Sequence, residues 1–310
     1  MKRIIPLIAV IAILGFAGFA LTSQTEEMKT VKVDLPALKA MEYFSDSAKM
    51  NVWMVPFTTS PVAFRNDKMV HGPDTLTLIK LSFLQADFRR SSPDGSFDFS
   101  VSVVPDKDSA HQSYFVINYN TTKWAAMFGN NQFAKDAMAS LDSLKVYLNN
   151  PEKLYGYKIK RELVEDTSFL FASKKIHRRD FAAESKAIYD MLIEEAKKRD
   201  AGYNGVRIFH FLDESDSTRT IYASIGITKR LELKDGEKVS YKLMPYQKNL
   251  LTLDFEGPYS DIPKAYTALE KFRVDYRYVT MAIPFHKYLD SGYGFPESKM
   301  VRMKVCYPVF

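Results

Sequence analysis

The C-terminal half of the chain repeats one order of strands and helices, and this repeat limits the possible folds more than any other feature. The first copy predicts a strand at 168–173, a helix at 181–199 and strands at 206–212 and 220–227. The second copy predicts a strand at 249–256, a helix with Ser260 as its cap, and strands near 278–283 and 301–309. Two tandem strand–helix–strand–strand (βαββ) units indicate an α+β domain built around a duplicated sheet.

Four short motifs in this half match those of a known family. Residues 257–259 supply the spacing G-x-Y before the second helix, and 288–290, 296–298 and 307–309 read Y-L-D, P-E-S and Y-P-V. With these motifs, residues 160–310 resemble the GyrI-like effector-binding domain, which also serves as the ligand sensor of some AraC-type and MerR-type regulators. The resemblance implies a duplicated βαββ (SHS2-type) sheet whose halves meet at a groove for small organic ligands.

This groove is the expected ligand site, and the expected ligand is a small, largely apolar or aromatic molecule. Aromatic side chains line such pockets, and a few polar groups orient the ligand. The residues expected in the groove are Phe209, Phe211, Tyr222, Glu256, Tyr259, Tyr266, His286 and Tyr288. The alternative for the rings is ordinary core packing, and for Glu256 it is an exposed strand end.

His286 departs from the family pattern. Many members carry an acidic residue two positions before the tyrosine of Y-L-D, which pairs with cationic ligands or catalyses hydrolysis in the hydrolytic members; here this position is His286. A histidine is at best partly positive near neutral pH and supplies no permanent anion. This departure counts against both cation recognition and the hydrolytic chemistry of the family.

Two other functions remain open from the sequence. A hydrolase of small reactive organic molecules would use Glu256, His286 and tyrosines as acid–base groups. A non-enzymatic envelope interaction protein would fill its pockets with side chains and bind a protein partner. The chain has no G-x-S-x-G, P-loop or G-x-G-x-x-G motif, which disfavours serine hydrolases and nucleotide-dependent enzymes.

Residues 30–150 predict a second α+β domain, with a helix, several antiparallel strands and a long final helix. The apolar stripe of the final helix consists of Phe133, Ala137, Leu141, Leu144 and Leu148. With Trp53 and Pro56 after the first helix, and 120–124 before the last, this order resembles the SRPBCC or START-like superfamily (polyketide cyclase-like). The resemblance implies a helix-grip fold enclosing an apolar cavity, which is expected to be reduced or filled in a chain this short.

The first 29 residues are typical of a targeting segment followed by a linker. Lys2 and Arg3 precede eighteen residues without a charge, 4–21, and a polar stretch follows them. A charged start before a long apolar run indicates a secretory signal peptide or a single N-terminal membrane anchor. We therefore expect the protein to be exported, and to be periplasmic or held to the membrane by residues 4–21.

Charge, cysteine and histidine content disfavour further classes of function. The net charge is +6, from 43 basic and 37 acidic residues in mixed runs, so no basic stripe predicts a nucleic-acid partner. The single cysteine, Cys306, precludes an intrachain disulfide and is expected to be a buried structural thiol. The five histidines, at 71, 111, 177, 210 and 286, lack metal-binding spacing, so neither a metal nor a cofactor is expected.

Overall fold

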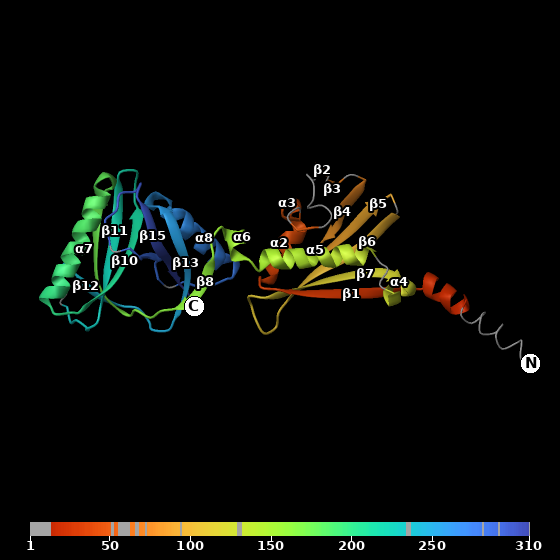
Figure 1. The fold of residues 1–310 in the computed structure, drawn as a ribbon, viewed down its shortest axis with the longest axis horizontal. Helices are drawn as coiled ribbons and strands as arrows, with labels where there is room; N and C mark the ends of the chain where they lie inside the picture. The colour runs from red at the N-terminus through yellow and green to blue at the C-terminus, as the bar shows by residue number, and fades with distance from the viewer. Residues whose placement is uncertain are drawn as a thin grey trace, which may run out of the picture. The chain divides into compact units, whose positions relative to one another are not determined.

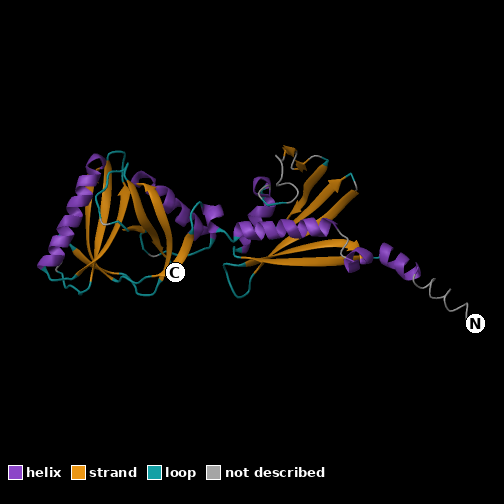
Figure 2. Ribbon diagram, viewed as in Figure 1, coloured by secondary structure: helices purple, strands orange, loops and turns teal. Residues whose placement is uncertain are grey.

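The computed structural model of the chain describes residues 14–50, 53–54, 63–65, 68–71, 73–93, 95–128, 132–233, 237–280, 282–290 and 292–309. The chain divides into two compact units, Met1–Asn150 and Pro151–Phe310. Each unit combines one antiparallel β-sheet with helices (Figure 2), which confirms the expected α+β class. Among the described residues, no helix has the length and apolar character needed to span a bilayer. Residues 4–13, more than half of the predicted targeting run, lie outside the described part.

The sheet of Met1–Asn150 has the strand order β1-β7-β6-β5-β4-β3-β2. Its strands are β1 (Gln24–Val33), β2 (Ala63–Arg65), β3 (Lys68–His71), β4 (Asp74–Leu81), β5 (Gln85–Ser92), β6 (Gly95–Pro105) and β7 (Ser113–Thr122). Strands β2 to β7 pair with their neighbours in sequence, and β1 joins the edge beside β7. The helices with described bounds are α2 (Ala37–Ser45), α3 (Ser47–Met50), α4 (Lys123–Phe128) and α5 (Gln132–Leu148).

The core of this unit holds much of the apolar stripe predicted for its long helix. The buried leucines of α5 are Leu141, Leu144 and Leu148. The side chain of Phe133, the first residue of the predicted stripe, lies outside the described part of the structure. Trp53 is 1% exposed, and its ring nitrogen donates a hydrogen bond to the carbonyl oxygen of Tyr43 at 3.1 Å. A cavity beside Trp53 and Ala137 measures about 30 Å³. It has room for about two water molecules and is too small for an organic ligand.

The sheet of Pro151–Phe310 has eight strands in the order β12-β9-β11-β10-β14-β15-β13-β8 (Figure 1). Its strands are β8 (Ile159–Leu163), β9 (Ser168–His177), β10 (Tyr203–Asp213), β11 (Thr218–Ile227), β12 (Ser240–Leu243), β13 (Asn249–Pro258), β14 (Phe285–Tyr288) and β15 (Met300–Pro308). The α-helices of this unit are α6 (Pro151–Tyr155), α7 (Phe181–Lys198) and α8 (Ile262–Asp275).

The two predicted copies are present as β9-α7-β10-β11 and β13-α8-β14-β15. In the first copy β11 pairs with both β9 and β10, and in the second β15 pairs with both β13 and β14. The strand predicted near 278–283 is wrong, because β14 spans Phe285–Tyr288, directly after Pro284. Proline lacks the N–H that a central strand contributes to its ladder, so pairing begins after it.

Each copy is also preceded by a strand that the sequence analysis missed. Strand β8 precedes β9 but pairs with β13 of the other copy, and β12 precedes β13 but pairs with β9. We call the connections 164–167 and 244–248 the crossing segments. Backbone hydrogen bonds join them: Val164 N to Lys248 O (2.9 Å), Gln247 N to Val164 O (3.0 Å) and Met244 N to Thr167 O (2.7 Å).

The length of the first crossing segment requires a curled sheet. In a flat sheet, six spacings of about 4.8 Å would separate β8 from β9 by about 29 Å. The five steps from Leu163 to Ser168 reach at most about 18 Å. The sheet therefore curls, and the crossing segments lie on its concave side.

Helices α7 and α8 cover one face of this sheet. Phe209 of β10 lies opposite His286 of β14 in the register, so both side chains point to the same face. The ring centroid of Phe209 lies 6.0 Å from that of Tyr189 in α7. The ring of His286 is hydrogen-bonded to the hydroxyl of Tyr266 in α8. We call this side the helix face, and the side that carries the crossing segments the open face.

Candidate functional site

The open face of Pro151–Phe310 contains a cavity of about 620 Å³. Its floor is a row of side chains that lie opposite one another in three neighbouring strands, Ile208 of β10, Ser224 of β11 and Phe171 of β9. Their neighbours along the strands, such as Phe209, point to the helix face, since side chains alternate along a strand. The cavity therefore lies on the side of the sheet opposite to α7 and α8.

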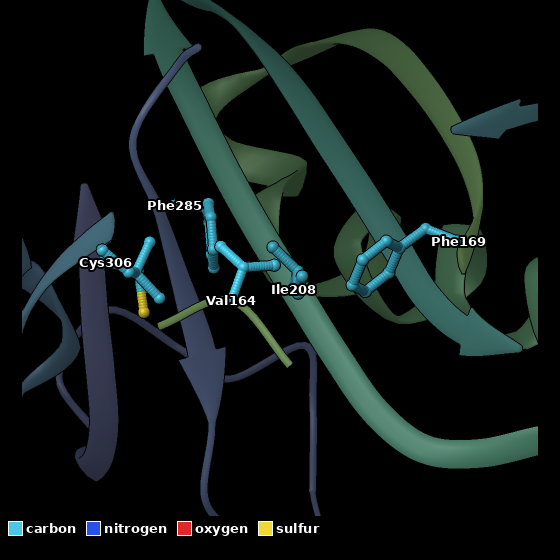
Figure 3. Packing of buried hydrophobic residues seen from close by; sticks show 6 residues of the cluster. Val164, Phe169, Ile208, Phe285 and Cys306 are labelled. Carbon is cyan, nitrogen blue, oxygen red and sulfur yellow. The ribbon is translucent and has the colours of Figure 1, made fainter. Parts of the chain in front are cut away.

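Four members of a buried apolar cluster, Val164, Phe169, Ile208 and Phe285, help to line the cavity. The cluster also contains Leu250 and Cys306. In Figure 3, Val164 lies beside Ile208 and Phe285. Because Val164 belongs to a crossing segment, the hydrogen bonds between the two crossing segments hold this part of the lining in place. The burial of Cys306 confirms the expectation of a structural thiol.

The rim of the cavity combines exposed apolar side chains with two lysines. Leu243 is 69% exposed and Ile283 is 56% exposed, although both are large aliphatic residues. Lys242 and Lys248 also line the cavity, and the ammonium of Lys242 lies 4.9 Å from the ring centroid of Phe171. Exposed apolar surface around a concavity is typical of a binding site.

The polar groups of the interior are few. His210 and Tyr222 lie opposite each other in the register, with ring centroids 5.8 Å apart. Burial lowers the pKa of His210, so the ring is neutral at neutral pH. Its Nδ1 is buried and has no hydrogen-bond partner among the described residues. An unsatisfied buried nitrogen is costly, and a ligand group could satisfy it.

A second cavity, of about 390 Å³, adjoins the first and shares five lining residues with it, Val164, Phe169, Ile208, Met244 and Phe285. It uses β14 and β15, the strands that correspond in the repeat to β10 and β11. Two ion pairs line it, Lys304 with Glu162 at 2.9 Å and Lys287 with Asp166 at 2.6 Å. The duplication has thus produced two equivalent cavities, one apolar and one charged.

Of the eight residues predicted from the sequence, only Tyr222 lines the 620 Å³ cavity. The structure gathers six others on the helix face: Phe209, Phe211, Tyr259, Tyr266, His286 and Tyr288. They surround His286, which is 0% exposed. The hydroxyl of Tyr259 lies 2.9 Å from His286 Nε2, and that of Tyr266 lies 2.9 Å from Nδ1. This group is therefore a packed core with a histidine at its centre.

The electrostatics of His286 fit this structural role. Burial lowers its pKa to about 3, so the ring stays neutral and has one N–H and one free nitrogen. Burial also raises the pKa of Tyr259 and Tyr266 well above the ordinary value, so both hydroxyls stay protonated. One tyrosine can then donate to the free nitrogen while the other accepts from the N–H. Both ring nitrogens are satisfied without a ligand.

Glu256 and His286 do not form a common acid–base site. Glu256 is exposed on β13, where it lies opposite Arg302, whereas His286 lies in the row of Val305 and Leu253 on the helix face. Glu256 is three residues from Leu253 on the same strand, so the alternation sends its side chain to the other face. The hydrolase hypothesis thereby loses the pair of groups on which it depended.

The sequence analysis missed the crossing segments and the residues that face them. His210 lies between Phe209 and Phe211 in β10, so alternation places its side chain on the face opposite to theirs, and no residue near Phe171 was predicted for the site. No group of three or more His, Cys, Asp or Glu side chains within the described ranges could hold a metal ion.

Comparisons with known proteins find similarity only at the level of solved structures. No family model matches the chain, and no curated protein sequence does. The EcmrR–DNA complex aligns at 12% identity over 60% of this chain and 75% of its own, with a TM-score of 0.37. The EcmrR C-terminal domain aligns at 14% sequence identity, over 50% of this chain and 98% of the domain, with a TM-score of 0.36. The Aha1 protein from Colwellia psychrerythraea aligns at 11% sequence identity, over 40% of this chain and 96% of its own, with a TM-score of 0.31. Values this low assign no family.

Proposed function

We propose that Pro151–Phe310 binds a small, largely apolar organic molecule in the cavity of its open face. The cavity itself is the observation that carries the proposal. Its volume of about 620 Å³ falls within the range of about 300–1,000 Å³ typical of small-molecule sites. Apolar side chains form most of its lining, and His210, Tyr222 and Ser224 supply a few polar groups, as in sites that orient a ligand.

The sequence motifs of the GyrI-like effector-binding domain support the same class of ligand. We propose membership of that family for residues 160–310, and an SRPBCC-like helix-grip fold for residues 30–150. The two halves differ in the space that they offer to a ligand. The cavity beside Trp53 is too small for a ligand, and a hollow of about 360 Å³ beside Asp87 and Asp98 is smaller and more polar than the open-face cavity, so the binding function is assigned to the C-terminal unit.

A thermal-shift screen of the full chain against small organic compounds tests the proposal. A ligand at one hundred times its dissociation constant stabilises the native state by about 2.7 kcal/mol, a readily measured shift. The expected result is a set of apolar compounds that raise the melting temperature of one transition. A broad screen without any stabilising compound would contradict the proposal.

The location of the site is tested by filling the cavity. Ser224→Phe places a ring at the centre of the floor, in a strand that favours aromatic residues, and is expected to weaken binding of any hit at least about tenfold. Ser173→Phe is the matched control, because Ser173 is exposed on the same face of β9 and does not line the cavity. Equal losses in the two variants, or none in either, would place the ligand elsewhere.

We also propose that residues 4–21 direct export of the chain or anchor it to a membrane. The support is the charge-free apolar run behind Lys2 and Arg3. Intact mass of the protein from its own cell separates the two outcomes. A mature form starting after Ala17 or Ala20, each preceded by a small residue two positions earlier, indicates a cleaved signal. A full-length form in the membrane fraction indicates an anchor, and a full-length form in the soluble cell extract contradicts both.

A further inference from the structure

We infer that the open-face cavity selects anionic ligands, organic carboxylates with an apolar body, over neutral or cationic molecules of the same shape. The inference rests on the proposed binding function and adds the charge of the ligand to it. It derives from the titratable side chains around the cavity and from a comparison with the second cavity of the same domain.

The charged residues that line the cavity are all basic. Lys242, on β12, and Lys248, at the end of a crossing segment, are both exposed at the rim. Among the described residues that line the cavity, none is an aspartate or a glutamate. Within the described ranges, neither lysine forms an ion pair, whereas many other lysines of the chain do. Two positive charges therefore border a largely apolar space without an acidic partner among the described residues.

The second cavity shows that lysines without acidic partners are not a general property of the cavities in this fold. There Lys287 and Lys304 are held by Asp166 and Glu162, and Glu165 adds a further negative charge. The same arrangement of strands thus carries neutralised lysines in one copy of the repeat and unneutralised lysines in the other. Lysines without an acidic partner would not strengthen the binding of a neutral ligand, whereas they attract an anionic one.

The geometry also fixes the orientation of such a ligand. Phe169, Phe171 and Ile208 form the interior, so the apolar body is buried there. The carboxylate remains at the rim, within reach of the lysines. The ammonium of Lys242 is held above the ring of Phe171, 4.9 Å from its centroid, which places it at the boundary between the apolar interior and water.

Three ligands that share a 12-carbon chain and differ in the head group test the inference. Dodecanoate, dodecanol and dodecylammonium are titrated into the full chain by calorimetry, below their aggregation concentrations and at low ionic strength. The expected order of affinity is carboxylate, alcohol, ammonium, with about a fivefold preference for the carboxylate over the alcohol. This preference is expected to shrink in high salt, because the lysines are exposed and the Debye length falls to about 3 Å at 1 M.

A charge-matched pair of variants assigns the effect. Lys242→Gln/Lys248→Gln is expected to abolish the preference, and Lys197→Gln/Lys264→Gln, exposed lysines of α7 and α8, to preserve it. Equal affinities for the three ligands, or a preference for the ammonium, overturn the charge selectivity. If the ligands bind without this selectivity and Ser224→Phe still abolishes their binding, the proposed binding function stands and only the charge selectivity is lost. Absence of binding by all three overturns the selectivity, and the compound screen then decides the function separately.

Discussion

The side chain of His286 shows how this domain handles a titratable residue that it buries completely. Its two ring nitrogens meet the hydroxyls of Tyr259 and Tyr266 at 2.9 Å each, and three further rings pack around it, those of Phe209, Phe211 and Tyr288. A buried polar group is tolerated when all of its hydrogen bonds are made. His286, which the sequence predicted for the ligand groove, is here part of the core.

Replacing His286 therefore costs stability. His286→Ala leaves two buried tyrosine hydroxyls without this partner and opens a cavity, which is expected to lower the free energy of unfolding of the C-terminal unit by about 3 kcal/mol. His177→Ala, at an exposed site on β9, is expected to change it by less than about 0.5 kcal/mol. Urea unfolding followed by far-UV circular dichroism measures both.

Tryptophan fluorescence adds an internal control to this experiment. Both tryptophans, Trp53 and Trp124, lie in Met1–Asn150, so their emission follows the N-terminal unit alone. The fluorescence transition is expected to stay unchanged in His286→Ala. A loss of stability below 1 kcal/mol in the C-terminal unit would show that the tyrosine bonds to His286 contribute little.

The pH dependence of stability follows from the same residue. In the unfolded chain the pKa of a histidine is about 6.5, whereas burial lowers the pKa of folded His286 to about 3. Between these values only the unfolded state takes up the proton, so His286 makes the protein less stable as the pH falls from 6.5 towards 3. One proton corresponds to about 1.4 kcal/mol per pH unit.

His286→Gln isolates this contribution, because glutamine keeps hydrogen-bonding groups but does not titrate. The slope of unfolding free energy against pH, measured between pH 6.5 and 4.5, is expected to be smaller in His286→Gln than in the native sequence. His177→Gln keeps a histidine at 286 and should retain the native slope. Parallel curves for all three proteins would mean that His286 is protonated in the folded state.

At the scale of elements, the crossing segments are the parts on which the site depends. They tie β8 and β12 to the opposite copies of the repeat and carry Val164 and Met244 to the cavity. Gln247 lies in the second segment with a φ of +55°, a conformation that costs a residue with a Cβ about 1–2 kcal/mol. In this conformation its N–H donates to Val164 O, so Gln247 bonds the two segments from the left-handed region.

Gln247→Val is expected to destabilise the C-terminal unit by about 1–2 kcal/mol, since a β-branched residue is strongly disfavoured at positive φ. Gln247→Asn is the matched control and is expected to be neutral within about 0.5 kcal/mol, because asparagine tolerates this region. Differential scanning calorimetry of the full chain gives both values. A valine variant as stable as the asparagine variant would contradict the proposed conformation.

In this unit the sequence predicted the strands and helices that bury a face, except β14, and missed the two strands that do not. The long strand at 168–177 and helix α7 have apolar patterns that their local sequence makes plain. Strand β8, with the sequence IKREL, and strand β12, with SYKL, are short, polar and mostly exposed, so no alternation marks them. Their pairing with the other copy depends on contacts far apart in the chain, such as Asn249 with Leu163.

At the scale of the whole C-terminal unit, alternation groups the candidate residues correctly but does not tell which face is covered. Phe209 and Phe211 belong to one face and His210 to the other, as any strand requires. Apolar residues occupy both faces of this sheet, because the crossing segments bury part of the open one. Alternation alone therefore did not separate Tyr222, which was predicted for the site, from Phe209 and Phe211 on the covered face.

The claim that a ligand occupies the open face has a direct test in photocrosslinking. Dodecanoate carrying a diazirine at its terminal carbon is bound to the full chain, irradiated, and the modified peptides are located by mass spectrometry. The account predicts label within 169–171, 243–245 and 282–285, which converge on the cavity, and loss of this label in Ser224→Phe. Label concentrated at Tyr259 and Tyr266, beside His286, or within Met1–Asn150, would contradict it.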